Sequence, residues 1–128
     1  MYSYLDLGKI GWLLLILSTM APYAIFMAFT FKEYGSIYIE DDHYLSLLGS
    51  IGSAANGIFR LIIGATLDYL SFKKIMLVIV AIFMVSCGTI VFSVKNEISY
   101  FITIVLSYGC EGSLFSLFPT QTVYILGK

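Results

Sequence analysis

Two charged side chains that lie deep in apolar stretches are the residues of this sequence that could do chemistry. Arg60, the only arginine in the chain, stands in the run NGIFRLIIGATLDYL, and Glu111 stands in the later run YGCEGSLFSLF. A guanidinium has five N–H donors in a rigid fork that matches a carboxylate, so Arg60 could bind an anionic group. A carboxylate in a low dielectric can take up a proton near neutral pH, so Glu111 could carry one.

The composition identifies the environment of these two charges. Apolar residues make up 59% of the chain, charged residues make up 12%, and mean hydropathy is +0.93. A soluble domain has about a quarter of its residues charged, so these values predict that the chain lies in a lipid bilayer. The net charge of −1 provides no basic surface, and we expect no nucleic-acid partner.

The sequence predicts neither a cofactor nor a metal site. Cys87 and Cys110 lie in separate apolar runs, which is typical of small buried side chains and gives no disulfide framework and no metal-ligand spacing. A phosphate-binding loop and a nucleophile triad are also missing from the sequence. We therefore expect a protein that is not an enzyme.

Four apolar runs must position the two charged side chains. They cover about residues 10–31, 45–70, 75–94 and 98–118, and each is long enough to cross the hydrocarbon core as an α-helix. The connections SFKK and KNE are too short to hold a domain, so adjacent helices must be antiparallel. The prediction is an all-α membrane protein with four transmembrane helices in a single, partial domain over residues 1–128.

The basic residues predict the orientation of the chain. With the N-terminus in the cytoplasm, four lysines are cytoplasmic and two are outside: Lys9, Lys73, Lys74 and Lys128 against Lys32 and Lys95. Basic residues favour the cytoplasmic side, so we expect an integral, multi-pass membrane protein with a cytoplasmic N-terminus. In the first connection, Asp42 is a candidate N-cap for the second helix.

Counting about 1.5 Å per residue indicates how deep the two charges lie. Arg60 is roughly 22 Å from Leu45, and Glu111 is roughly 20 Å from Ile98 on the same side of the membrane. An arginine at the centre of a membrane helix costs about 2.5–3.5 kcal/mol, so an ion pair with Glu111 at matched depth would offset part of that cost. Three interpretations stay open: a structural salt bridge, an anionic substrate bound by Arg60, and a proton carried by Glu111.

Small and polar residues follow one side of the second run. At 100° per residue, eight of them fall within about half of the helix circumference: Gly49, Gly52, Ser53, Asn56, Gly57, Arg60, Gly64 and Asp68. Small side chains let membrane helices approach closely. We therefore expect the glycines between positions 49 and 57, with Ser53, to pack against neighbouring helices.

The end of this run resembles a loop signature of the major facilitator superfamily, G-x-x-x-D-[RK]-x-G-[RK]-[RK]. The matching residues are Gly64, Asp68 and Lys73, and the residues that depart from it are Tyr69, Ser71 and Phe72. The longer series Asn56-x-x-x-Arg60-x-x-x-Gly64-x-x-x-Asp68 is similar to the eighth helix of oxalate/formate-antiporter-like and monocarboxylate-transporter-like members. Monocarboxylate transporters typically have aspartate at the position of Asn56. The stretch YGCEGSLFSLFPTQTVYILG resembles the tenth helix of such proteins.

The resemblance implies helices seven to ten of a twelve-helix transporter, within a facilitator-type bundle. In that family the arginine of the eighth helix binds the substrate carboxylate, which assigns this role to Arg60, with Asn56 beside it. The loop aspartate caps and gates the cytoplasmic side, which assigns that role to Asp68. A carboxylate with Lys73 and Lys74 at a helix junction can hold or release neighbouring helices, and a solvated turn is the plain alternative.

The sequence thus predicts a fragment of a secondary transporter that moves a small solute, such as a monocarboxylate or another organic anion, by alternating access. Besides the lipid bilayer and the solute, the expected partners are the missing transporter helices or further copies of the chain. Glu111 is expected to act as a gating or structural charge. The alternatives are a four-span structural or assembly protein and a small oligomeric transporter without facilitator architecture.

Overall fold

The computed structural model describes residues 7–126 and is helical almost throughout. Four helices follow one another: α1 (Leu7–Ser36), α2 (Asp42–Thr66), α3 (Phe72–Ser93) and α4 (Glu97–Leu126). Each of them is long and apolar enough to cross a membrane, and no strand occurs in the described part of the chain. The prediction of an all-α, four-helix membrane protein is confirmed, and the chain is an integral, multi-pass membrane protein.

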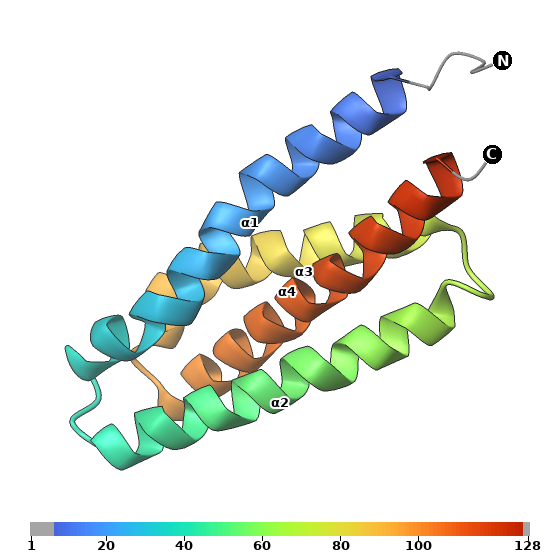
Figure 1. Cartoon of the computed structure of the whole chain (residues 1–128). Helices are drawn as coiled ribbons and strands as arrows, with labels where there is room; N and C mark the ends of the chain where they lie inside the picture. The colour runs from blue at the N-terminus through green and yellow to red at the C-terminus, as the bar shows by residue number, and fades with distance from the viewer. Residues whose placement is uncertain (1–6, 127–128) are drawn as a thin grey trace, which may run out of the picture.

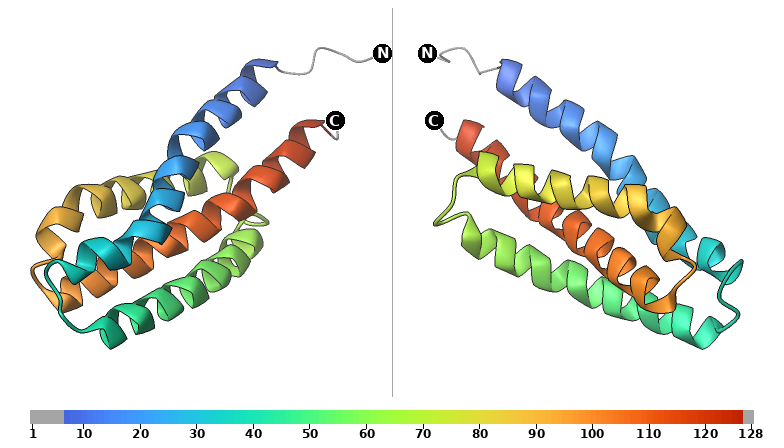
Figure 2. Two further views of the ribbon diagram at one scale, coloured as in Figure 1. Left: turned by 60° about the vertical axis from the view of Figure 1, so that its left-hand side comes forward. Right: turned by 180° about the vertical axis from the view of Figure 1, so that it is seen from behind.

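Helix α4 lies in the middle of the bundle and packs against the three other helices (Figure 1). The connections are short, so successive helices are antiparallel and α2 runs in the same direction as α4. One end of the bundle holds the α1–α2 and α3–α4 connections; we call it the two-loop end. The other end, which we call the terminal end, holds the α2–α3 connection, the start of α1 and the end of α4 (Figure 2).

Glycines bring α2 and α4 into close contact. A Cβ atom at Gly112 of α4 would overlap the backbone of Asn56, and one at Gly109 would lie 3.0 Å from the ring of Phe59. In the other direction, a Cβ atom at Gly52 of α2 would lie 2.9 Å from the ring of Tyr108. Membrane helices can approach this closely only where one of them lacks a side chain. The lack of side chains at these glycines therefore allows the two backbones to lie this close together.

The other small residues of α2 have different surroundings. Gly49 packs against Phe31 of α1, which confirms the expected packing role for this residue as it is confirmed for Gly52. The described helices do not supply the packing expected for Gly57, where an added Cβ atom would meet nothing within 4 Å, or for Ser53, which is exposed. The part of α2 that holds Ser53 and Gly57 has no helix packed over it among the described residues.

Helix α1 is attached to the bundle mainly at the two-loop end. There the hydroxyl of Tyr100 donates a hydrogen bond to the Phe31 carbonyl, and the hydroxyl of Tyr108 donates one to the Ala28 carbonyl over 3.2 Å. Toward the terminal end α1 moves away from α2, and α4 lies between them (Figures 1 and 2). In that half, α1 contacts the core through half-buried apolar side chains: Leu13, Ile16, Leu17 and Met20.

Three helices end four or more residues away from their predicted C-terminal residues, and all four helices begin one to three residues earlier than predicted. The first helix continues from residue 31 to Ser36 and the fourth continues from 118 to Leu126, while the second ends at Thr66 rather than at 70. Apolar runs mark the part of a helix that lies in lipid, whereas the backbone hydrogen bonds can continue beyond it. Conversely, residues 67–70, three of which are apolar, form a turn and a bend.

The described lysines lie at the two ends of the bundle in the same two groups that the sequence predicted. Lys9, Lys73 and Lys74 are at the terminal end, whereas Lys32 and Lys95 are at the two-loop end. Lys128 lies outside the described residues.

Candidate functional site

Two neighbours hold the Arg60 guanidinium on the surface of α2. Its Nη2 atom donates a hydrogen bond of 3.1 Å to Oδ1 of Asn56, one turn earlier on the same helix. Its central carbon lies 5.3 Å from the centre of the Phe115 ring, which reaches it from α4. Residues four apart on a helix are neighbours, and an aromatic face attracts a cation at this distance. Arg60 is thus exposed but oriented.

Glu111 does not form the ion pair with Arg60 that its depth in the sequence predicts. No carboxylate lies within 4 Å of the Arg60 nitrogens among residues 7–126, although the charge of Arg60 still acts on Glu111. Gly52 meets Tyr108, Asn56 meets Gly112, Phe59 meets Gly109 and Gly64 meets Ser116, so residues of α2 face residues 50 to 56 positions later on α4.

A shift along the helix axis does not explain the missing ion pair. The contacts place Arg60 level with residues 110–116 of α4, a range that includes Glu111. Arg60 is instead exposed on α2, where its guanidinium lies beside Asn56 and the Phe115 ring. The matched depth of the two charges is therefore compatible with the contacts, but the ion pair does not form.

Arg60 is also nearer to one membrane surface than the sequence suggested. Helix α2 begins at Asp42 and ends at Thr66, so Arg60 has 18 residues before it and only 6 after it. At 1.5 Å per residue, its Cα atom is roughly 9 Å from the terminal end of α2, within the range over which a long basic side chain can extend toward water. The guanidinium therefore belongs to the half of the bundle at the terminal end.

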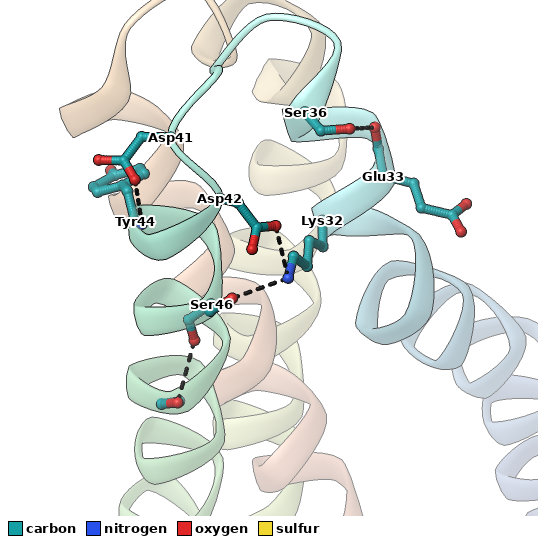
Figure 3. Close-up of polar contacts among 8 residues, drawn as sticks. Lys32, Glu33, Ser36, Asp41, Asp42, Tyr44 and Ser46 are labelled. Carbon is teal, nitrogen blue, oxygen red and sulfur yellow. Dashed lines mark hydrogen bonds and ion pairs between the residues drawn. The ribbon is translucent and has the colours of Figure 1, made fainter.

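A cluster at the opposite end of the same side of α2 was not predicted. The Nζ atom of Lys32 on α1 lies 2.9 Å from Oδ1 of Asp42 and 2.9 Å from the hydroxyl of Ser46 (Figure 3). Glu33, the next residue, points away from this cluster. The expectation that Asp42 caps α2 is wrong, because the N-cap is Asp41, whose Oδ1 accepts a hydrogen bond from the Tyr44 amide. Asp42 instead joins α2 to α1.

The turn between α2 and α3 holds exposed charges. Asp68, Lys73 and Lys74 are all exposed, and no ion pair within the described residues joins the carboxylate to either lysine. Asp68 follows the C-terminus of α2, and the lysines occupy the first turn of α3. The negative charge of Asp68 and the positive charges of the lysines are both unfavourable at these positions, because a helix C-terminus repels anions and an N-terminus repels cations. Helix stability does not account for these charges.

The residues that sequence reasoning missed are Phe115, Lys32 and Ser46. Exposed aromatic residues are ordinary on membrane helices, so nothing marks Phe115 until α4 is placed beside α2. Lys32 and Asp42 carry a weak signal, since they are opposite charges at the two ends of a short helix connection. Residues 7–126 contain no group of three or more His, Cys, Asp or Glu side chains that could hold a metal ion.

Comparison with known proteins adds no family to this description. No protein family matches the chain, and neither a curated protein nor a solved structure matches it significantly. The resemblance to the major facilitator superfamily therefore rests on the residues quoted for it: Asn56, Arg60, Gly64, Asp68 and Lys73, with the glycine-rich and proline-containing stretch of α4.

Proposed function

We propose that the chain is part of a transmembrane secondary transporter that moves a small organic anion, such as a monocarboxylate, by alternating access. The observation that carries this proposal is the state of Arg60. Its guanidinium lies in a membrane-spanning helix, exposed and oriented by Asn56 and Phe115, with no carboxylate within ion-pair distance in residues 7–126.

The chemistry of a guanidinium favours an anionic ligand at this position. Asn56 accepts from one of the five N–H donors, and the Phe115 ring covers one face, which leaves the donors on the remaining edges available. Arginine matches a carboxylate with two parallel hydrogen bonds, and such charge-assisted bonds are stronger than neutral ones. A bound carboxylate would also offset the cost of placing this charge in the membrane.

Glu111 makes anion binding at the proposed site depend on protonation. In its ionised form the carboxylate repels an anion that approaches Arg60 from α4, whereas the protonated form does not. No ion pair joins Glu111 to Arg60 in residues 7–126, so Glu111 does not neutralise Arg60 directly. Within this proposal, Glu111 adjusts anion binding by its charge, and Arg60 with Asn56 provides the contacts.

The terminal end is the cytoplasmic side in this proposal. Lys9, Lys73 and Lys74 lie there, and cytoplasmic connections carry an excess of basic residues. Negatively charged lipid head groups would compensate the two lysines that start α3. Asp68 and these lysines then act at the cytoplasmic gate, where the helix junction is held or released during alternating access.

A structural or assembly protein is the second candidate function, and the surroundings of Gly57 favour it. A small, exposed residue in a membrane-spanning helix, with nothing within 4 Å of an added Cβ atom, suits close contact with another helix. That helix could belong to another copy of the chain or to the rest of a larger transporter. Transport requires the anion at Arg60 in addition to this contact, and assembly does not.

Uptake measurements with variants of Arg60 test the proposal. The complete gene product is reconstituted in liposomes, and uptake of a labelled monocarboxylate such as lactate is compared for wild type, Arg60→Lys and Arg60→Gln. We expect both variants to lose uptake by about tenfold or more, because lysine keeps the charge but not the fork. Lys95→Gln, which removes an exposed cation from the other end, is the matched control and should transport normally.

Folded yield separates the two candidate functions. Lost uptake with normal yield and a normal elution profile in detergent supports a substrate role for Arg60. Normal uptake by Arg60→Gln contradicts it, and lost yield without any uptake defect per folded molecule leaves Arg60 a structural role only.

A further inference from the structure

We propose that Lys32, Asp42 and Ser46, with the Phe31 ring beneath them, form a closure at the two-loop end that separates the Arg60 side of α2 from water at that end. The closure opens when the Lys32–Asp42 ion pair breaks and the C-terminal half of α1 moves away from α2. This inference deepens the transport function proposed above and rests on it for its biological meaning. Its structural part can be tested without transport.

The outer layer of the closure is polar and joins two helices. The Lys32 ammonium contacts both the Asp42 carboxylate and the Ser46 hydroxyl at 2.9 Å, so one α1 side chain spans a full turn of α2 (Figure 3). The side chains are 43% and 78% exposed for Lys32 and Asp42. An ion pair this exposed contributes little net stability, which lets it break and re-form.

The inner layer is apolar and lies one turn deeper. The Phe31 ring fills the space above Gly49, where a Cβ atom would lie 2.9 Å from it, and it contacts the Tyr108 ring edge to face at 5.8 Å. Phe31 is 7% exposed. One aromatic side chain of α1 thus fills the space between α2 and α4 directly below the Lys32 cluster.

Below Phe31 the same side of α2 becomes uncovered. Gly49, Ser53, Asn56 and Arg60 follow one another at intervals of three or four residues, which places them along one side of the helix. Ser53 and Arg60 are exposed, and Gly57 beside them has nothing within 4 Å of an added Cβ atom. The Lys32 and Phe31 layers therefore lie between the two-loop end and the Arg60 guanidinium.

Helix α1 has a weak point from which its C-terminal half can move. Pro22 lies inside α1 and lacks the N–H group that would bond the carbonyl of Ser18. The neighbouring Tyr23 hydroxyl is buried, and among residues 7–126 only the Cys87 thiol, a weak hydrogen-bonding group, interacts with it. A buried hydroxyl that lacks a strong hydrogen-bond partner costs free energy. A movement of α1 that gives the Tyr23 hydroxyl such a partner therefore recovers part of the free energy that the movement costs.

Thiol labelling measures the closure directly. Ser53→Cys places a reactive group below the Phe31 layer, in a background with Cys87→Ser, because Cys87 is exposed and Cys110 is buried. A membrane-impermeant maleimide is added from each side of right-side-out and inside-out vesicles. We expect Lys32→Gln and Asp42→Asn each to raise the labelling rate from the two-loop side by about two- to fivefold, the factor that corresponds to loss of an exposed ion pair.

A charge exchange distinguishes the ion pair from a general loss of stability. The double variant Lys32→Asp with Asp42→Lys restores opposite charges and should return labelling to the wild-type rate. Glu40→Gln, which removes an exposed charge at the same end outside the cluster, is the control and should leave the rate unchanged. Asp42→Asn keeps the inference testable if changes at Lys32 reduce folded yield, because it leaves α1 intact.

The results also separate this inference from the proposed function. Equal labelling of wild type, Lys32→Gln and Asp42→Asn overturns the closure, and so does a charge exchange that labels as fast as the single variants. If Arg60→Gln transports normally while the labelling rates change as expected, the transport proposal fails and the closure stands.

Discussion

At the scale of single residues, the orientation of Arg60 depends on two side chains from different helices. Asn56 limits where Nη2 can lie, and the Phe115 ring supports the face of the guanidinium. Phe115 is 49% exposed, so it contributes little to the core, and its ring contacts Arg60 of α2. The ring is therefore a positioning residue for the proposed anion site.

Replacing Phe115 with leucine tests this positioning role. We expect Phe115→Leu to raise the concentration of monocarboxylate that gives half-maximal uptake by roughly two- to fivefold, because a cation–π contact at an exposed site contributes about 0.5–1 kcal/mol. The maximal uptake rate and the melting temperature should change little. The matched control is Phe92→Leu, an exposed phenylalanine near the C-terminal end of α3, and equal effects of the two variants contradict the prediction.

The pair of Asn56 and Arg60 could be predicted from the sequence, whereas the pair of Arg60 and Glu111 could not. A spacing of four residues on one helix fixes the first pair whatever the neighbouring helices do. The second pair depends on which sides of α2 and α4 face each other, and the contacts at Gly52, Gly109 and Gly112 determine those sides. The hydropathy of the sequence does not indicate which glycine contacts which neighbouring helix.

At the scale of the helices, α2 and α4 are held at a distance that admits no side chain at position 112. The Cβ atom of an alanine there would overlap the Asn56 backbone, which cannot move aside as the end of a flexible side chain can. The spans themselves follow from the apolar runs, because each run is as long as the bilayer core is thick. The helix ends do not, because α1 and α4 extend beyond their apolar runs.

Gly112→Ala should destabilise the α2–α4 pair. We expect a loss of about 1–3 kcal/mol in unfolding free energy from overpacking, seen as a lower melting temperature by circular dichroism in detergent. Gly57→Ala is the matched control, because its added methyl group meets nothing within 4 Å and alanine favours a helix over glycine by about 1 kcal/mol. A Gly112→Ala variant as stable as Gly57→Ala contradicts the close contact.

At the scale of the whole molecule, the four helices leave one side of α2 uncovered while they cover the other with α4. The uncovered side holds Ser53, Gly57 and Arg60, and α1 reaches it only at the two-loop end. A guanidinium in a membrane helix usually faces protein or a water-filled cavity rather than lipid. We therefore expect a further helix, from another copy or from the rest of a transporter, to lie over this side.

A bulky residue at Gly57 tests whether such a helix is present. Gly57→Leu should leave the melting temperature of the four-helix unit within a few degrees, since nothing lies within 4 Å of the added group. It should reduce uptake, or shift the oligomer toward the monomer in cross-linking and light scattering. Unchanged uptake together with an unchanged oligomeric state would show that no helix packs against Gly57. Ala54→Leu, on an exposed lipid-side position of α2, controls for added bulk.

The close packing of α2 on α4 also has a consequence for synthesis. Helix α3 is made before α4, so α2 enters the membrane before the helix that carries Phe115, Gly109 and Gly112 exists. Fifty-five residues separate Arg60 from Phe115, which corresponds to several seconds at about 5–20 residues per second. During that interval Arg60 lacks the Phe115 ring and has Asn56 beside it, and its side chain lies close enough to the terminal end of α2 to extend toward water.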